Sequence, residues 1–223
     1  MSDIDRYEEA VRIIEASFEP YFWSKTLSPF EVLISTILSQ KTERRGTKSA
    51  FDRLRSRIGT TPEELAAANL LDIVDAIRPA GLYRSKAPKI KEIARLLLDK
   101  YSGDLSRILN LPTDEARKEL IGLPGVGPKT ADILLSFVGK RPVFPVDVHI
   151  ERVAKRLGLV PEKARYEEIR VAYERIILPD DRMRAHMAII EFGREICTAR
   201  NPKHGICPVS QYCDYYKGLL FGS

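Results

Sequence analysis

Three cysteines and one histidine near the C-terminus have the residue types and the spacing of a metal site. Cys197, Cys207 and Cys213 are all the cysteines of the chain, and His204 lies between the first two. Thiolates and neutral imidazoles are ligands of both zinc and iron. Two interpretations are open at this point: a four-ligand metal centre, or three thiols with a histidine nearby by chance.

A second stretch with chemical potential is the glycine-rich connection at residues 123–128, "LPGVGP". Pro124 is expected to end the preceding helix, because proline cannot continue one. Gly125 and Gly127 permit backbone angles closed to other residues and leave amide N–H groups uncovered. At the start of the next helix, such amides form a site for a backbone phosphate. The alternative is an ordinary corner between two helices.

The composition of the chain indicates what kind of partner and which compartment to expect. The 223 residues carry a formal net charge of +5, a modest excess that suits a polyanionic partner. The first residues carry acids where a signal peptide carries positive charge, and no apolar run approaches the roughly 18 residues that span a membrane. We therefore expect a cytoplasmic, nucleoid-associated protein without a membrane partner. In such a reducing compartment, clustered cysteines hold metal more often than disulfides.

The elements that position these residues are predicted to be helices. Apolar residues recur at three- and four-residue spacing, and no segment alternates as a strand does. Ser28 and Thr61 each precede a proline and stand three residues before a glutamate, which predicts capping boxes. The predicted helices are residues 6–18, 28–40, 61–70, 86–101, 113–123, 129–140, 146–158, 166–178 and 183–197. The fold class is therefore all-α.

In combination, these stretches resemble a known family. "LPGVGPKTA" at residues 123–131, followed by "VDVHI" at 146–150, resembles the helix-hairpin-helix DNA glycosylases of the endonuclease III branch. Three further stretches resemble parts of the same family. Its Ser-Gln-x-Thr helix is matched by residues 33–42, and its Gly-Leu-Tyr-x-x-Lys-Ala loop by residues 80–90. The helix before its iron–sulfur loop is matched by residues 189–197. The resemblance covers almost the whole chain. It implies a two-lobed helix-hairpin-helix glycosylase fold with a C-terminal cluster loop.

The resemblance also offers an answer for the cysteines. The family's loop runs Cys-x6-Cys-x2-Cys-x5-Cys and holds one [4Fe–4S] cluster. Here Cys197, Cys207 and Cys213 take the first, third and fourth places, and His204 takes the second. Imidazole can ligate iron in such centres, so we expect three cysteine ligands and one histidine ligand. Zinc or an incomplete cluster is the alternative.

Two residues carry the catalysis that the resemblance implies. Lys129 matches the family's catalytic lysine, whose neutral amine attacks the sugar C1′, expels the base and forms a Schiff base. The positive helix end and partial burial in a base pocket are expected to favour the neutral amine. Monofunctional relatives have Ser or Tyr at this position, so Lys129 implies glycosylase and AP-lyase activity. Without the resemblance, Lys129 would be interpreted as a solvated charge or a phosphate contact.

Asp147, eighteen residues after Lys129, matches the family's essential aspartate. Its carboxylate would stabilise positive charge on the sugar and help deprotonate the lysine. It is also the expected N-cap of the helix in which Ile150, Val153 and Leu157 mark the buried stripe. His149 is interpreted either as a phosphate or supporting contact, or as a packed or capping histidine.

The remaining predicted contacts are with DNA. A damaged base must leave the duplex before its sugar is reachable, so the gap needs filling. Gln40 and Leu82 resemble the family's two gap-filling residues. Lys41 departs from relatives with a neutral residue there, which puts the preferred opposite base in doubt. The other predicted DNA contacts are Gly125, Val126, Gly127, Lys129, His149, Arg200 and Lys203.

We expect two lobes with the active site in the cleft between them. A six-helix domain at residues 24–141 contains the hairpin, and residues 1–23 with 142–223 form the second lobe with cluster loop 197–213. The leading hypothesis is a monomeric base-excision glycosylase and AP lyase acting on oxidised pyrimidines in duplex DNA. The alternatives are a glycosylase for mismatched thymine or uracil or another lesion, and a non-catalytic DNA-binding module. A pure binder would need neither Lys129 nor Asp147.

Overall fold

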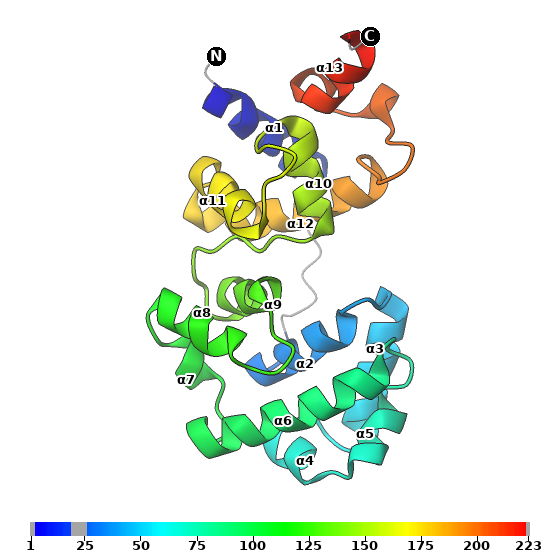
Figure 1. Cartoon of the computed structure of the whole chain (residues 1–223), viewed down its shortest axis with the longest axis vertical. Coiled ribbons are helices and arrows are strands. Elements are labelled where there is room, and N and C mark those ends of the chain that lie inside the picture. The colour runs from blue at the N-terminus through cyan, green and yellow to red at the C-terminus, as the bar shows by residue number, and fades with distance from the viewer. Residues whose placement is uncertain (1–2, 19–25, 222–223) are drawn as a thin grey trace. The chain divides into compact units, whose positions relative to one another are not determined.

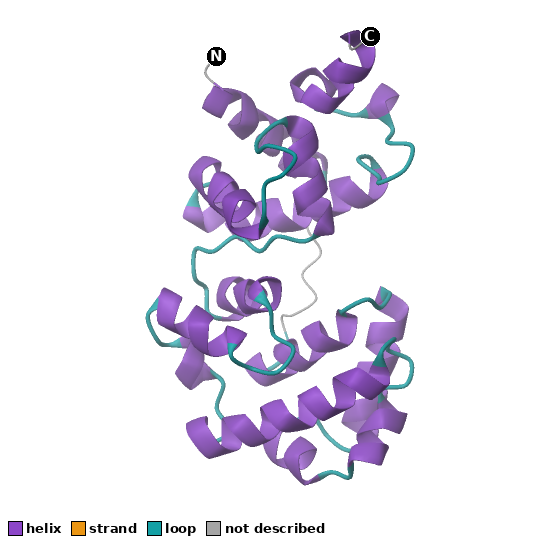
Figure 2. Ribbon diagram, viewed as in Figure 1, coloured by secondary structure: helices purple, strands orange, loops and turns teal. Residues whose placement is uncertain are grey.

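The chain forms two compact helical units. The computed structural model describes residues 3–18 and 26–221 (Figure 1). One unit comprises Met1–Phe22 and Pro142–Ser223, and the other comprises Trp23–Arg141. The predicted boundary between residues 23 and 24 lies outside the described residues. Within the described ranges the elements are helices and no strand occurs (Figure 2), which confirms the all-α prediction. None of the helices described is long and apolar enough to cross a membrane.

The unit of residues 23–141 is built around a buried helix. Its elements are α2 (Pro29–Ser39), α3 (Arg44–Arg57), α4 (Pro62–Ala67), α5 (Leu70–Ala76), α6 (Tyr83–Tyr101), α7 (Ser106–Leu109), α8 (Thr113–Ile121), α9 (Pro128–Ile133) and the π-helical segment η1 (Leu134–Val138). Buried side chains extend round α2, as in a helix covered by others on most sides. The predicted capping boxes at Ser28 and Thr61 are both present, so α2 and α4 begin where the sequence indicates.

This unit has more helices than the six predicted. Helices α3, α5 and α7 occupy segments to which the sequence analysis assigned no helix. Helix α3 buries only Ala50, Phe51 and Leu54 among its fourteen residues, so its apolar pattern is weak. Helices α5 and α7 are seven and four residues long, too short for a period of 3.6 residues to stand out. Packing against neighbouring helices stabilises such segments more than their own propensity does.

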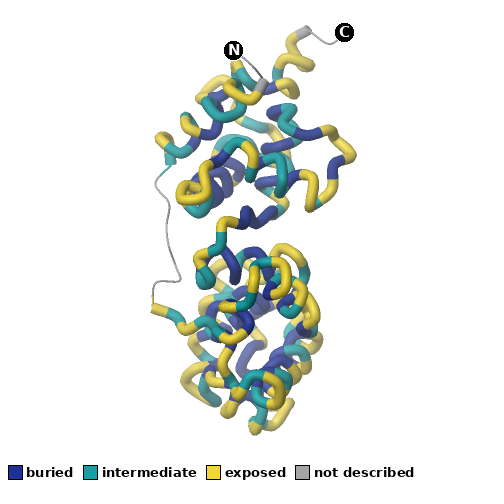
Figure 3. Tube along the Cα trace, turned by 90° about the vertical axis from the view of Figure 1, so that its left-hand side faces the viewer, coloured by how far each residue is buried: buried dark blue, intermediate teal, exposed yellow. Residues whose placement is uncertain are grey.

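The other unit packs its helices and the cysteine-bearing loop around one core. Its elements are α1 (Asp3–Ser17), α10 (Val148–Leu157), α11 (Tyr166–Ile176), η2 (Pro179–Asp181), α12 (Arg182–Glu195), η3 (His204–Ile206), η4 (Ser210–Tyr212) and α13 (Asp214–Phe221). Phe144 and Tyr173 stack in this core with ring centroids 4.7 Å apart. Val209 and Cys213 are buried in the same core, so the loop is anchored in it. Figure 3 shows the buried positions within each unit.

Candidate functional site

The glycine-rich connection joins α8 to α9 as a tight hairpin. Helix α8 ends at Ile121, two residues before the end of the predicted helix at residues 113–123, so it stops before Pro124 is reached. Gly125 has φ +80°, a left-handed angle that favours glycine. Gly127 is the N-cap of α9, and a Cβ added there would meet nothing within 4 Å. Val126 is buried, and its backbone N–H donates to the Leu123 carbonyl at 3.1 Å, so this amide is engaged in the turn itself.

A buried ion pair ties the two helices of the hairpin together. Asp132 on α9 is fully buried and accepts hydrogen bonds from Arg117 Nε at 2.7 Å and Nη2 at 3.1 Å. The bidentate geometry sets the position of α9 on α8. Lys129, the second residue of α9, is exposed, so the predicted partial burial is absent from this structure.

Gln40 lies beside the hairpin. It is the C-cap of α2, and its Nε2 donates to the Gly125 carbonyl at 3.1 Å and reaches Thr130 Oγ1 at 3.4 Å. Thr130 directly follows Lys129. Leu82, at the N-cap of α6, is 56% exposed and has φ +59°. The left-handed region costs a non-glycine residue conformational free energy, so the surrounding structure must hold Leu82 there.

In the other unit, Asp147 caps α10 as predicted. Its Oδ1 accepts hydrogen bonds from the backbone N–H of His149 at 2.8 Å and of Ile150 at 2.9 Å. Ile150, Val153 and Leu157 are buried, which confirms the predicted apolar stripe. Lys129 and Asp147 belong to different units, and their approach to one substrate remains a prediction.

His149 has the contacts of a packed histidine. Its Nδ1 lies 2.9 Å from Arg152 Nη2, and a guanidinium only donates, so we assign Nδ1 as the acceptor and Nε2 as protonated. Burial lowers the pKa of His149, and the charge of Arg152 acts in the same direction. A Cβ added at Gly193 would lie 2.9 Å from the His149 Cβ, so α12 passes very close. These contacts favour the packing interpretation.

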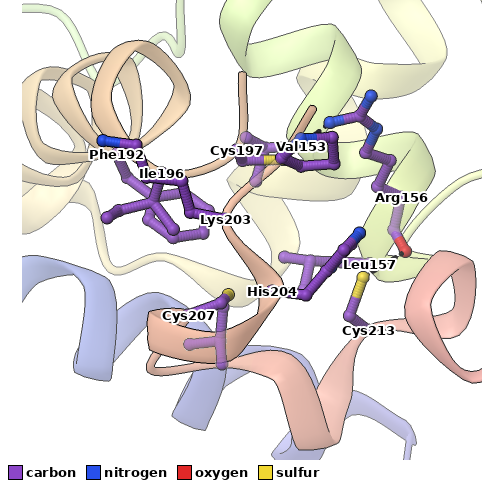
Figure 4. Close-up of a pocket in the computed structure, with 12 residues that line it drawn as sticks. Val153, Arg156, Leu157, Phe192, Ile196, Cys197, Lys203, His204, Cys207 and Cys213 are labelled. Atoms are coloured by element: carbon purple, nitrogen blue, oxygen red, sulfur yellow. Dashed lines mark hydrogen bonds between the residues drawn. The ribbon is translucent and has the colours of Figure 1, made fainter. Parts of the chain in front are cut away.

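The four predicted metal ligands line one cavity (Figure 4). Cys197, His204, Cys207 and Cys213 surround it together with apolar side chains of α10 and α12. Burial raises the pKa of the Cys207 and Cys213 thiols, so isolated thiolates are disfavoured there unless a cation compensates them. Within residues 3–18 and 26–221, no three side chains of the ligand types converge on one metal ion. A cavity lined by four such side chains suits a cubane cluster, which takes one ligand on each iron.

Arginines of α10 hold the loop that contains these ligands. Arg152 donates from Nε to the Cys197 carbonyl at 2.8 Å and from Nη2 to the Gly193 carbonyl at 2.7 Å. Arg156 Nη1 donates to Cys197 Sγ at 3.3 Å and to the Thr198 carbonyl at 2.8 Å. Donors to a ligand sulfur and to the ligand backbone orient the ligand and tune a cluster.

His204 is oriented by an aromatic neighbour, and the predicted basic residues are exposed. Its ring stacks on Tyr216 with centroids 4.5 Å apart and an interplanar angle of 13°. Arg200 and Lys203 are exposed on the same loop. Thr198 Oγ1 donates to the Arg200 carbonyl at 2.8 Å, so the loop backbone has internal support.

Several residues that support the site were missed by the sequence analysis. Arg152, Arg156 and Lys86 would each be interpreted from sequence as a solvated cation, because each has a partner 41 or more positions away. Asp132 had a usable signal: a single acid within the apolar run "TADILLSFV". An acid in a buried stripe requires a partner.

Comparison with known proteins decides the family. The family model of the HhH-GPD superfamily base excision DNA repair proteins matches residues 34–179. The chain belongs to this superfamily. The iron-sulfur binding domain of endonuclease III matches residues 197–213, so this HhH-GPD protein carries an iron–sulfur segment at its predicted cluster loop. The helix-hairpin-helix resemblance is thereby confirmed.

Relatives narrow the position within the HhH-GPD superfamily to the endonuclease III type. Endonuclease III of Thermotoga maritima is 38% identical over 86% of this chain and 86% of its own length. Endonuclease III of Sulfolobus acidocaldarius is 32% identical over 95% of this chain and 93% of its own. A solved structure of a trapped endonuclease III–DNA covalent intermediate matches with a TM-score of 0.87 and 31% identity over 99% of this chain and all of that one. This HhH-GPD protein is a base excision repair DNA glycosylase, and AP-lyase activity is typical of its family.

Proposed function

We propose that the chain removes oxidised pyrimidines from duplex DNA and then cleaves the strand through a Schiff base on Lys129. The observation that carries the proposal is the position of Lys129 at the start of α9, directly after the hairpin. Gln40, the proposed gap-filling residue, is hydrogen-bonded to Gly125 and Thr130 on either side of it. A relative with 31% identity was solved as a covalent intermediate with DNA.

The chemistry of Lys129 follows from its amine. The neutral Nζ attacks C1′ of the damaged nucleotide, the C1′–N bond breaks, and the base leaves with the bonding electrons and takes up a proton. Opening of the sugar ring and loss of a proton from nitrogen give the Schiff base. This iminium acidifies C2′–H, so removal of that proton expels the 3′ phosphate by β-elimination.

Asp147 supplies the carboxylate for this reaction. Its Oδ1 is held by two backbone N–H groups of α10, so the side chain has a fixed direction. A carboxylate fixed in this way stabilises the positive charge that develops on the sugar without having to reorient. In our proposal it acts on the nucleotide that Lys129 attacks.

We propose a [4Fe–4S] cluster with Cys197, His204, Cys207 and Cys213 as ligands. The four side chains line one cavity, and the match to the family's iron–sulfur domain begins at Cys197 and ends at Cys213. The cluster, when bound, supplies cross-links that hold the loop. Zinc is the alternative occupant.

The partner in this proposal is duplex DNA that contains a damaged base. The phosphate contacts are the backbone amides of Gly125 and Gly127, on either side of Val126, and the side chains of Arg200 and Lys203. Leu82 and Gln40 occupy the gap left by the flipped base, and His149 supports the cap of α10. The protein acts as a monomer on chromosomal DNA in the cytoplasm.

The test is covalent trapping by borohydride with duplexes that each contain one modified base. The wild-type protein should form a protein–DNA adduct during turnover, and Lys129→Ala should form none. Lys118→Ala is the matched control, because Lys118 is an exposed lysine on the other helix of the same hairpin. A normal adduct yield from Lys129→Ala would overturn the assignment, and the lesion that reacts fastest identifies the substrate.

A further inference from the structure

A lysine buried beneath the two proposed gap-filling residues has no role in the mechanism above. Lys86, in the first turn of α6, is only 3% exposed. Lysine is rarely buried to this extent unless its ammonium has partners. Burial lowers the pKa of Lys86 to about 8, so most of the population is still charged at pH 7.

The partners of this ammonium are at the end of α2. Lys86 Nζ donates to the Leu38 carbonyl at 2.7 Å and to Thr42 Oγ1 at 2.9 Å. The Leu38 carbonyl is one of the last in α2, where acceptors lose their helical donors. Between the two contacts the chain turns sharply, with Lys41 at φ +51°. A non-glycine residue at this angle needs its surroundings to hold it there.

The same lysine is attached to the loop that carries Leu82. Its backbone N–H donates to the Leu82 carbonyl at 3.0 Å, which begins α6. Leu82 is itself at φ +59° and has no side-chain cap. The two loops touch, because a Cβ added at Gly81 would lie 3.2 Å from the Lys41 carbonyl oxygen. Lys86 therefore joins two strained loops, one through its backbone and one through its side chain.

We propose that Lys86 is a positioning residue that holds Gln40 and Leu82 in register, so that both can enter the duplex when the damaged base leaves. This rests on the proposed function, because it gives those two residues their gap-filling role. Loss of the ammonium would free the 40–42 turn from α6. Gln40 would then lose its fixed place between α2 and the hairpin, where it contacts Gly125.

The experiment replaces Lys86 by methionine, which keeps the length of the apolar stem and removes the donors. Single-turnover excision of a damaged pyrimidine should fall about 10- to 100-fold, the size expected when reacting groups are misplaced by about 1 Å. The fluorescence of 2-aminopurine opposite the lesion, which reports the estranged base, should change less on binding than with wild type. Borohydride trapping on a preformed abasic site should be less affected, because no base has to be unstacked and expelled.

The chain offers a matched control on the same helix. Lys91 also holds carbonyl groups at a helix end, donating to Ala66 at 2.9 Å and to Ala68. It touches neither loop through these bonds. Lys91→Met should lower the melting temperature as Lys86→Met does, yet retain excision and the 2-aminopurine signal. Each variant is assayed at the same number of degrees below its own melting temperature. Lys86→Arg should recover part of the excision rate, because a guanidinium can also donate to both acceptors.

Thr42→Val provides a second variant in case Lys86→Met fails to fold, because it removes one acceptor of the ammonium and keeps the buried charge. It also removes the bond from Thr42 Oγ1 to the Gln40 carbonyl (3.2 Å), which belongs to the same 40–42 turn. It should reproduce the 2-aminopurine change to a smaller degree. Equal losses of excision in Lys86→Met and Lys91→Met, or normal excision in both Lys86→Met and Thr42→Val, would overturn the inference. Failure of wild type to trap DNA would instead overturn the proposed function, and this inference with it.

Discussion

Arg152 connects the backbone of Cys197 to His149. Its Nε donates to the Cys197 carbonyl at 2.8 Å, and its Nη2 lies 2.9 Å from His149 Nδ1. The backbone N–H of His149 in turn donates to Asp147 Oδ1. The start of the cluster loop is therefore linked to the proposed catalytic carboxylate. All these bonds lie within one unit.

Replacing Arg152 by methionine should therefore loosen the loop. Two carbonyl groups would lose charged donors, and we expect a loss of about 2–4 kcal/mol in the free energy of unfolding. Iron should also leave the protein faster in the presence of a chelator, measured by the loss of visible absorption. Lys155→Met is the control on the same helix, because it breaks only the i,i+4 pair with Glu151 and should cost no more than about 1 kcal/mol. Equal iron loss in the two variants would contradict the prediction.

Asp147→Asn separates the capping role of this side chain from its chemistry. Asparagine caps a helix as well as aspartate does, so the variant should fold with nearly wild-type stability. It should bind damaged duplex and lose at least about 100-fold in excision rate, since the charge is gone. Asp147→Ala should lose the rate and about 1 kcal/mol of stability as well. Retained activity in Asp147→Asn would reduce the residue to a helix cap.

Variants of His204 test which metal centre the loop binds. Anaerobically purified protein should be brown and contain about four irons per chain. His204→Cys should keep the iron and lower the reduction potential, because thiolate donates more charge than imidazole. His204→Ala should make the cluster labile and loosen residues 197–213, while the helices of residues 29–138 stay folded. DNA affinity should then fall more than the rate of the chemical step, because Arg200 and Lys203 lose their support.

Tyr216→Leu is the companion variant to these, since it removes the stacking partner of the His204 ring and leaves the ring itself in place. Its cluster should be intact and lost more readily than in wild type. Zinc in place of iron, or an unchanged spectrum in His204→Ala, would count against histidine ligation.

Removing only one partner of the buried Arg117–Asp132 pair should lower the free energy of unfolding substantially. Asp132→Asn removes the charge of the buried carboxylate that pairs with the Arg117 guanidinium, and we expect a loss of about 3 kcal/mol, measured by urea unfolding. The double variant Arg117→Met/Asp132→Leu should recover most of that loss, because neither partner is left uncompensated. Asp52→Asn breaks the exposed pair with Lys48 and serves as the control, within about 1 kcal/mol of wild type.

Local signals in the sequence determined the helix starts and pointed to the candidate site residues. Ser28, Thr61 and Asp147 cap their helices as predicted, because a capping bond joins residues within three positions of each other. The ligand register of residues 197–213 and the place of Lys129 after the glycine-rich connection are equally local, and the family match agrees with the loop.

The tertiary structure alone decided how these residues are supported. The contacts Lys86–Leu38, Arg117–Asp132 and Arg152–Cys197 span 48, 15 and 45 positions. A sequence indicates which residues are charged, but it does not indicate which distant acceptor each will meet, because that depends on how the helices pack. For the same reason Lys86 and Arg152 have the sequence pattern of solvated cations, although both are structural donors once the helices have packed.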